Sequence, residues 1–259
     1  MASFESLALT GLAIGVVVGL TGVGGGSLMT PLLVTVFGVP APVAVGTDLA
    51  CAAITKSAGT IAHRSARTIV PGIVLRLVTG SVPAALVTLL VLAQLDVHSH
   101  ALDRAIRMGV AIALLVSIGA LLVRGRLRRW AESAPLLQRH RDRRGAFTVL
   151  AGALIGAAVA FTSLGAGAIG AACLALLYPE LEAAEIAGSD IAHAVPLTAI
   201  AAIGHAWLGT IDYALLLALI AGGIPGIVIG SLLTRRVPRM ALRTLLLGTL
   251  ALAAAKLLI

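Results

Sequence analysis

Eight long apolar runs make up most of this 259-residue chain, and they constrain its fold more than any other feature of the sequence. About 20 mainly apolar residues cross the hydrocarbon core of a bilayer as a helix, and most of the runs are near this length. With 59% hydrophobic residues, 12% charged residues and a mean hydropathy of +1.06, the chain lacks the polar surface of a water-soluble domain. The sequence therefore predicts an all-α polytopic membrane protein, with apolar runs at residues 7–37, 42–64, 69–93, 104–123, 147–178, 184–208, 211–233 and 239–258.

Two of these runs, 7–37 and 147–178, are too long for one straight membrane-spanning helix. Each is interrupted near its middle by glycine-rich sequence, TGVGGGS at 21–27 and TSLGAG at 162–167. We therefore expect each to form two half-helices that meet at a break within the membrane, in a re-entrant or a discontinuous arrangement.

The two halves of the chain resemble each other. At an offset of 142 residues, GTDLACA at 46–52 aligns with GSDIAHA at 188–194, and the two glycine-broken runs align at an offset of 141. Matches of Asp, His, Gly and Pro are much less expected by chance in an apolar chain than matches of Ala, Leu and Val. The sequence predicts two transmembrane repeats of about four helical segments each, at 1–123 and 146–259, joined by an arginine-rich loop at 124–145.

The joining loop carries most of the net charge. It holds eight arginines and two acidic residues, which gives +6 of the net +8 of the whole chain. In a soluble protein a pI near 11 would suggest nucleic-acid binding, but arginines between apolar spans instead place their loop on the cytoplasmic side of the membrane. We expect no nucleic-acid partner, and the lipid bilayer as the surroundings.

The threading of the broken runs decides how the repeats are related. If each run is re-entrant, each half crosses the membrane three times and the repeats are inverted; if each run crosses, the repeats are parallel. The re-entrant threading also places the arginines at 64, 67, 235, 236 and 239 in the cytoplasm, so inverted repeats are favoured.

The glycine breaks are the first candidate binding site. A half-helix that begins near Ser27 would expose unpaired backbone N–H groups and the positive end of its dipole at membrane depth, which suits an anion. The alternative is that these glycines only allow tight turns and close packing. The candidate residues are Thr21, Gly24, Gly25, Gly26 and Ser27, with Thr162, Gly165 and Gly167 in the second half.

The run 42–64 is the second candidate, because it holds Asp48, Thr55, Lys56 and His63 in an otherwise apolar sequence. An ammonium group at the depth of Lys56 needs a partner or must lose its proton. Either Asp48 and Lys56 form an ion pair that fixes helix packing, or Lys56 faces an anionic substrate.

The second half repeats Asp190 and His205 but has Thr198 where the first half has Lys56. A charge present in one half only is a better candidate for substrate binding than one present in both. His193 lies one turn beyond Asp190 and could be held by it, as a proton relay or as a packing bond. We expect no catalytic residue, metal or cofactor.

Three ordered segments, GLTGVGGGSLMTPLL, AVGTDLACAAITKSAGTIAH and LVTGSVPAAL, resemble the TauE/SafE family of sulfite exporters. The resemblance implies a multi-pass protein of the bacterial inner (plasma) membrane that exports sulfite or a related small sulfur-containing anion, such as thiosulfate or sulfoacetate. The second copy departs from the pattern with TSLGAGAIG in place of the triple glycine. By resemblance, the family's motifs map onto Gly22, Gly24, Gly25, Gly26, Gly46, Thr47, Asp48, Thr55, Lys56 and His63.

Two other functions compete with this interpretation. An intramembrane phosphatase acting on lipid pyrophosphate also uses buried polar residues, but it needs clustered acids and arginines, and the buried acids here are only Asp48 and Asp190. A passive anion channel is left open because a sequence does not reveal alternating access. A homodimer is also left open.

Overall fold

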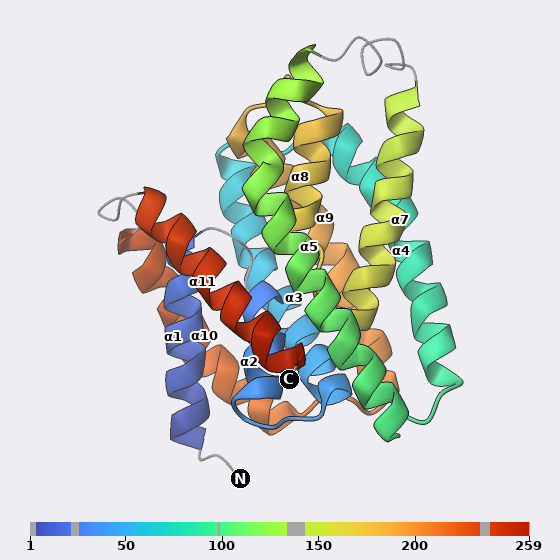
Figure 1. Cartoon of the computed structure of the whole chain (residues 1–259), viewed down its shortest axis with the longest axis vertical. Coiled ribbons are helices and arrows are strands. Elements are labelled where there is room, and N and C mark those ends of the chain that lie inside the picture. The colour runs from blue at the N-terminus through green and yellow to red at the C-terminus, as the bar shows by residue number, and fades with distance from the viewer. Residues whose placement is uncertain (1–3, 22–25, 98, 134–142, 234–238, 259) are drawn as a thin grey trace.

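A computed structural model describes residues 4–21, 26–97, 99–133, 143–233 and 239–258, and every regular element within these ranges is a helix (Figure 1). The all-helical prediction is confirmed. The helices of the first half are α1 (Phe4–Thr21), α2 (Gly26–Thr35), α3 (Ala41–Ser65), α4 (Pro71–Ala93) and α5 (His100–Ser133). Those of the second half are α7 (Arg144–Thr162), α8 (Ala168–Leu177), α9 (Ala183–Trp207), α10 (Tyr213–Leu233) and α11 (Arg239–Leu258).

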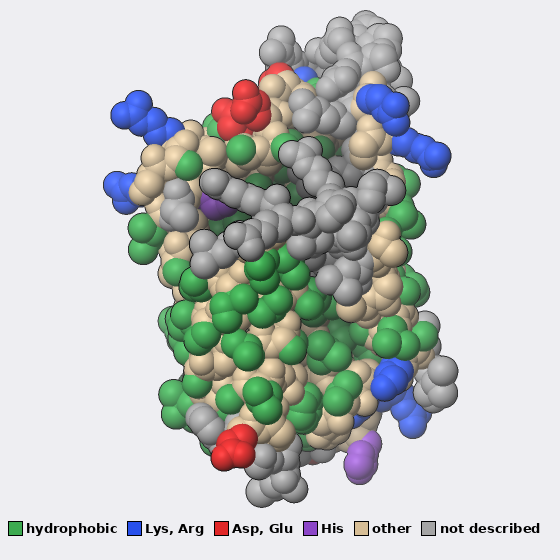
Figure 2. All heavy atoms as spheres, turned by 90° about the vertical axis from the view of Figure 1, so that its left-hand side faces the viewer, with side chains coloured by type: hydrophobic (Ala, Val, Ile, Leu, Met, Phe, Trp, Pro, Cys, Tyr) green, Lys and Arg blue, Asp and Glu red, His purple; other side chains and the backbone are tan. Residues whose placement is uncertain are grey.

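Five of the described helices, α4, α5, α7, α9 and α10, are long and apolar enough to cross a membrane by length and composition. Hydrophobic side chains cover much of the middle and lower part of the face in Figure 2, and its charged side chains lie toward the two ends. The protein is therefore a polytopic membrane protein. Helix α5 is longer than the apolar run that predicted it, because it continues through residues 124–133 of the arginine-rich segment.

The second glycine-broken run folds as a helical hairpin. At the start of α7, the Thr148 hydroxyl lies 2.8 Å from the hydroxyl of Tyr178, just beyond the end of α8. Arg144 and Glu180 form an ion pair of 2.6 Å at the same end. Helix α8 therefore runs back beside α7 and ends near the point where α7 began.

The break between α7 and α8 occurs where the sequence predicts it, in TSLGAG. Helix α7 ends in the left-handed residue Ser163, with a φ of 61°. Gly165 and Gly167 have φ values of 133° and 119°, which L-amino acids with a side chain rarely adopt. In the first half, α1 ends at Thr21 and α2 begins at Gly26, and residues 22–25 lie outside the described ranges.

The two halves pack across each other, since α1 lies against α10 and α7 against α4. Both contacts depend on glycine. A Cβ atom on Gly80 of α4 would overlap the carbonyl oxygen of Val149 in α7, and one on Gly222 of α10 would overlap that of Ala8 in α1. Backbones can approach this closely only where no side chain intervenes.

Helices α3 and α9 pack against each other between these outer pairs. The Thr47 hydroxyl in α3 accepts the backbone N–H of Asp212 at 3.1 Å, and the Ser189 hydroxyl in α9 accepts that of Val70 at 3.0 Å. Each of the two helices is thus fixed by the loop that follows the other. Their pairing brings the polar residues of both halves together.

Candidate functional site

A group of buried polar side chains lies around the α3–α9 contact, and we refer to it as the polar cluster. Its members come from both halves of the chain and from five helices or helix ends. All are at most 7% exposed. They are Thr30 of α2, Asp48 and Lys56 of α3, Ser81 of α4, Ser163 at the α7–α8 break, and Asp190 and His193 of α9.

Asp48 joins three of these elements through one carboxylate oxygen. Its Oδ2 accepts hydrogen bonds from the Thr30 hydroxyl at 2.6 Å, the Thr30 backbone N–H at 3.3 Å and the Ser163 hydroxyl at 2.9 Å. Its Oδ1 is buried and accepts no hydrogen bond from the described residues. Three donors on one oxygen fix the position of this buried carboxyl group between α2, α3 and the α7–α8 break.

Lys56 is 7% exposed and makes no hydrogen bond or ion pair with any residue in the described ranges. The Asp48–Lys56 ion pair, one of the two alternatives that the sequence left open, is therefore not formed among the described residues. The charges of Asp190 and Asp48 both act on Lys56 through space, and Asp190 has the larger effect. Lys56 is thus a buried cation near two carboxylates that holds neither at contact distance.

Asp190 is the counterpart of Asp48 in the second half, but its surroundings differ. Its Oδ1 lies so close to Gly170 of α8 that a Cβ on that glycine would overlap it. At the offset of 141, Ala171 stands where the first half has Thr30, so no hydroxyl is available at that position. The two carboxylates are therefore not equivalent.

His193 is completely buried, and its Nε2 lies 2.9 Å from the hydroxyl of Ser81 in α4. The expectation that Asp190 would hold this ring is wrong, because α4 supplies its partner. The Nδ1 atom is buried and has no hydrogen-bond partner among the described residues. Helix α3, which carries Lys56, packs against the helix of His193.

The other two predicted histidines lie at helix ends. His63 Nδ1 is 2.7 Å from the Thr68 hydroxyl, and His205 Nδ1 is 2.8 Å from the Thr210 hydroxyl. Nε2 of His205 also bonds the carbonyl of Ala160 at 2.9 Å. Each histidine is fifteen residues from the aspartate of its helix, about 22 Å along the axis, so neither lies beside that aspartate.

The remaining predicted residues surround the cluster or lie beyond the description. The Thr55 hydroxyl bonds the Cys51 carbonyl of its own helix at 3.0 Å. The Thr162 hydroxyl bonds the Ala158 carbonyl at 2.7 Å and, with Gly165 and Gly167, shapes the α7–α8 break. Thr21 ends α1, and Gly26 and Ser27 begin α2. Gly24 and Gly25 lie outside the described residues.

Sequence reasoning missed three members of the cluster, Thr30, Ser81 and Ser163. Ser163 lies inside the predicted break, so its position was a usable signal. Ser81 aligns with Gly223 at the offset of 142, and Thr30 aligns with Ala171, so each is polar in one half only. The asymmetry that singled out Lys56 would have found both.

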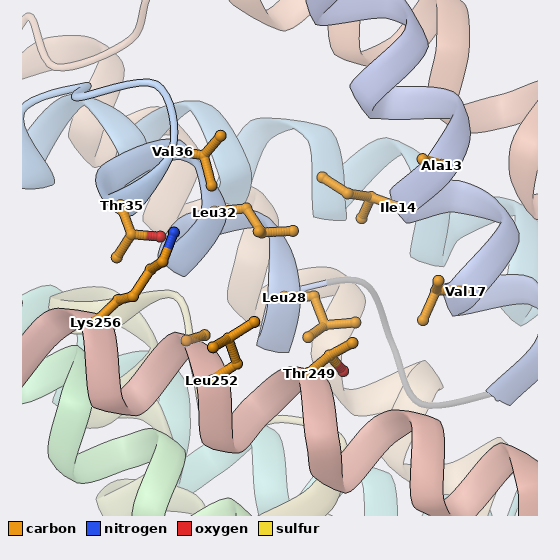
Figure 3. A pocket seen from close by; sticks show the side chains of 11 residues that line it. Ala13, Ile14, Val17, Leu28, Leu32, Thr35, Val36, Thr249, Leu252 and Lys256 are labelled. Atoms are coloured by element: carbon orange, nitrogen blue, oxygen red, sulfur yellow. The ribbon is translucent and has the colours of Figure 1, made fainter.

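A separate groove of about 190 Å³ lies between α1, α2 and α11 (Figure 3). Its lining is mainly apolar, with Leu28, Leu32 and Leu252 among its residues, and Lys256 extends toward Thr35 at one end. The groove contains none of the predicted site residues. Its lining does not suit a small hydrophilic anion.

The fold and the cluster define a class of protein: a multi-pass membrane protein with buried charge at the contact between its halves, as in transporters. Residues 7–257 match the model of the family described as sulfite exporter TauE/SafE, and the chain belongs to this family. It is 39% identical over 241 residues to "Probable membrane transporter protein YjnA" of Bacillus subtilis (strain 168), with 89% of this chain and 90% of that protein covered. No solved structure matches the chain. The protein is therefore a membrane transporter and not a phosphatase.

Proposed function

We propose that the protein exports sulfite or a related small sulfur-containing anion across the bacterial inner membrane, and that the anion binds beside Lys56. The observation that carries the proposal is the buried ammonium of Lys56, which has no hydrogen bond or ion pair among the described residues. A buried cation that touches no anion is costly even with carboxylates near it, and an anionic substrate would supply the direct contact. The family supplies the class of anion.

The two glycine-broken segments support the same position for the anion. Ser163 at the second break and Thr30 near the start of α2 both bond Asp48. The two broken segments therefore meet at Asp48, which lies eight residues before Lys56 in α3, about 12 Å along the helix axis. The role of Gly24 and Gly25 stays a prediction.

We also propose that the two halves are inverted repeats whose broken segments are re-entrant. The α7–α8 hairpin, which returns to the end where α7 began, favours this threading. The glycine contacts favour it as well. Gly80 of α4 packs on α7, and Gly222 of α10, which stands 142 residues later, packs on α1 in the same way. Inverted repeats with broken helices are a common architecture of secondary transporters.

The experiment measures binding of sulfite, thiosulfate and sulfoacetate to the purified full chain, with chloride for comparison. We expect Lys56→Met to lose anion binding by at least about tenfold and Lys56→Arg to retain part of it, because burial makes the charge of Lys56 matter more than in water. Lys256→Met is the matched control, since the chain has only these two lysines and Lys256 lies in the apolar groove.

The rate of efflux from proteoliposomes, loaded with the anion that binds, should rank the variants in the same order as their anion binding does. The proposal fails if Lys56→Met binds as the unmodified protein does. It also fails if Lys256→Met loses as much binding as Lys56→Met.

A further inference from the structure

The two ends of the α3–α9 contact are built from corresponding residues of the two halves. Near the start of α3, a Cβ on Gly46 would overlap the carbonyl oxygen of Thr210, just beyond the end of α9. Near the start of α9, a Cβ on Gly188 would overlap the carbonyl oxygen of Thr68, just beyond the end of α3. The start of each helix therefore lies at the end of the other, and α3 and α9 are antiparallel.

Each end is closed by the same two further contacts. A histidine in the last turn of one helix bonds the threonine five residues later, and a hydroxyl near the start of the other helix accepts a backbone N–H from the loop. Every residue of one end stands 142 residues from its counterpart at the other. The first set, the His63 end, is His63, Thr68, Val70, Gly188 and Ser189; the second set, the His205 end, is His205, Thr210, Asp212, Gly46 and Thr47.

The buried charges of the polar cluster lie between the two ends. Asp48 directly follows Thr47 of the His205 end, and Asp190 directly follows Ser189 of the His63 end. Lys56 stands on α3 between the levels of these two carboxylates, eight residues beyond Asp48. With 25 residues each, α3 and α9 are about 37 Å long. An anion that moves along their contact to Lys56 therefore passes one of the two ends.

The two ends are not equally closed. The ring of His205 is 1% exposed, and its Nε2 bonds the carbonyl of Ala160 in α7 in addition to the contact of Nδ1 with Thr210. His63 and Thr68 are half-buried, and within the described residues the His63 ring makes only the contact of its Nδ1 with Thr68. Fewer contacts hold the His63 end, so it should separate more easily.

The antiparallel packing also couples the two ends. Helix α3 carries Gly46 and Thr47 of one end and His63 of the other, and α9 carries the corresponding residues in reverse. A tilt of α3 against α9 that separates the contacts at one end therefore presses together those at the other. Such rocking of one half against the other around a central site is a common form of transport movement.

We propose that the His63 end and the His205 end are the two gates of the transporter, that they open in alternation, and that the His63 gate opens more readily when no anion is bound. This rests on the proposed function, since it assumes an anion that is carried past Lys56. In the threading proposed above, Arg64 and Arg67 place the His63 gate at the cytoplasm, where an exporter takes up its anion.

The test follows the access of a membrane-impermeant maleimide to Lys56→Cys, at the centre of the contact. The two native cysteines are first replaced, by Cys51→Ala and Cys173→Ala. The rate of labelling is measured in right-side-out and in inside-out membrane vesicles without any anion, so that it does not depend on the substrate. We expect faster labelling in inside-out vesicles, because the maleimide then reaches Lys56→Cys through the His63 gate.

Thr68→Val and Thr210→Val each remove one hydroxyl from one gate and keep the size of the side chain. Each should speed labelling by about two- to tenfold, the change that the loss of one hydrogen bond produces in an equilibrium. The two variants should act from opposite sides of the membrane, which a merely structural role of the threonines would not produce. Thr88→Val is the matched control, since its hydroxyl bonds only the carbonyl of Ala84 in α4, and it should change labelling from neither side.

Pairs of cysteines test the same gates by closing them. Val70→Cys with Ser189→Cys replaces a contact of 3.0 Å in the His63 gate, and Thr47→Cys with Asp212→Cys replaces one of 3.1 Å in the His205 gate. Either disulfide, formed with copper phenanthroline, should stop the efflux of sulfoacetate or thiosulfate from proteoliposomes, and a reductant should restore it. Sulfite is not used because it cleaves disulfides.

The outcomes separate this inference from the proposed function. Valine variants that act from the same side, or that leave labelling unchanged, would overturn the gates, and so would efflux that continues with either disulfide formed. Faster labelling of the reporter through the His205 gate would overturn the difference between the gates. If a valine variant does not fold, the cysteine pair of that gate decides. Failure of the proposed function would appear differently, as gates that respond to the valine variants in a protein whose Lys56 binds no sulfur anion.

Discussion

Ser163, at the break between α7 and α8, donates a hydrogen bond of 2.9 Å to Asp48 of α3, 115 residues earlier in the chain. The bond links the glycine break of one half to the polar helix of the other. Asp48 also holds Thr30 of α2, so one carboxylate oxygen positions parts of both broken segments. A shift of either segment would therefore change the charge environment of Lys56.

Removing the Ser163 hydroxyl should weaken anion binding and lower stability, since a hydrogen bond to a charged group contributes about 1.5 to 3 kcal/mol. Ser163→Ala should lower the thermal unfolding temperature more than Ser163→Gly, because glycine relieves a left-handed residue that costs about 1 to 2 kcal/mol. Both variants should bind the anion more weakly in the panel assay.

The matched control is Ser57→Ala, whose hydroxyl bonds only the carbonyl of Ala53 in its own helix. Binding in Ser163→Gly equal to that of the unmodified protein would show that the bond to Asp48 fixes packing alone.

Pairs of substitutions test whether Lys56 is only a structural counter-ion. If it merely neutralised Asp48 or Asp190, removing both charges should restore function. We expect the reverse: Lys56→Met with Asp48→Asn, and Lys56→Met with Asp190→Asn, should both stay unable to bind the anion. Equilibrium binding to the purified single and double variants decides the matter, and recovery in either double variant counts against a substrate role for Lys56.

The fold was largely predictable because long apolar runs indicate membrane helices. The helix break was predictable because a positive φ favours glycine, so a glycine-rich stretch within such a run indicates an interruption. The apolar runs gave nearly all the helices, and TSLGAG gave the break after Thr162. Helix α5 extends further than its apolar run because backbone hydrogen bonding continues into arginine-rich sequence, where hydropathy gives no signal.

The site was only partly predictable, for a different physical reason. Asp48, Lys56, Asp190 and His193 stand out as polar residues in apolar runs, and burial makes such residues costly. Their partners depend on how helices pack across the halves, which the spacing within one helix does not specify. Helical spacing suggested Asp190 as the partner of His193, whereas α4 places Ser81 there.

Close approach of the backbones at α4–α7 and α10–α1 predicts matched effects of substitution in the two halves. Gly80→Ala and Gly222→Ala should each destabilise the protein by about 1 to 3 kcal/mol or more, because the added methyl meets a backbone carbonyl that cannot move aside. Gly119→Ala in α5 is the control, since nothing lies within 4 Å of the added atom. Thermal unfolding followed by size-exclusion chromatography in detergent measures the differences, and a neutral Gly222→Ala would contradict the packing of α10 on α1.

The arginine distribution and the helix directions predict the orientation of the chain in the membrane. The end of α5 and the start of α7 lie together at the upper end of Figure 1, whereas the start of α1 and the end of α11 lie in its lower half. With the arginine-rich segment in the cytoplasm, both termini should face the periplasm. Alkaline phosphatase, which folds only outside the cytoplasm, should be active when fused after Ile259 and inactive when inserted at 134–142. If a reporter fused after Ile259 shows instead that this end lies in the cytoplasm, the chain after the loop crosses the membrane an even number of times. The inverted, re-entrant threading, which needs an odd number, would then be wrong.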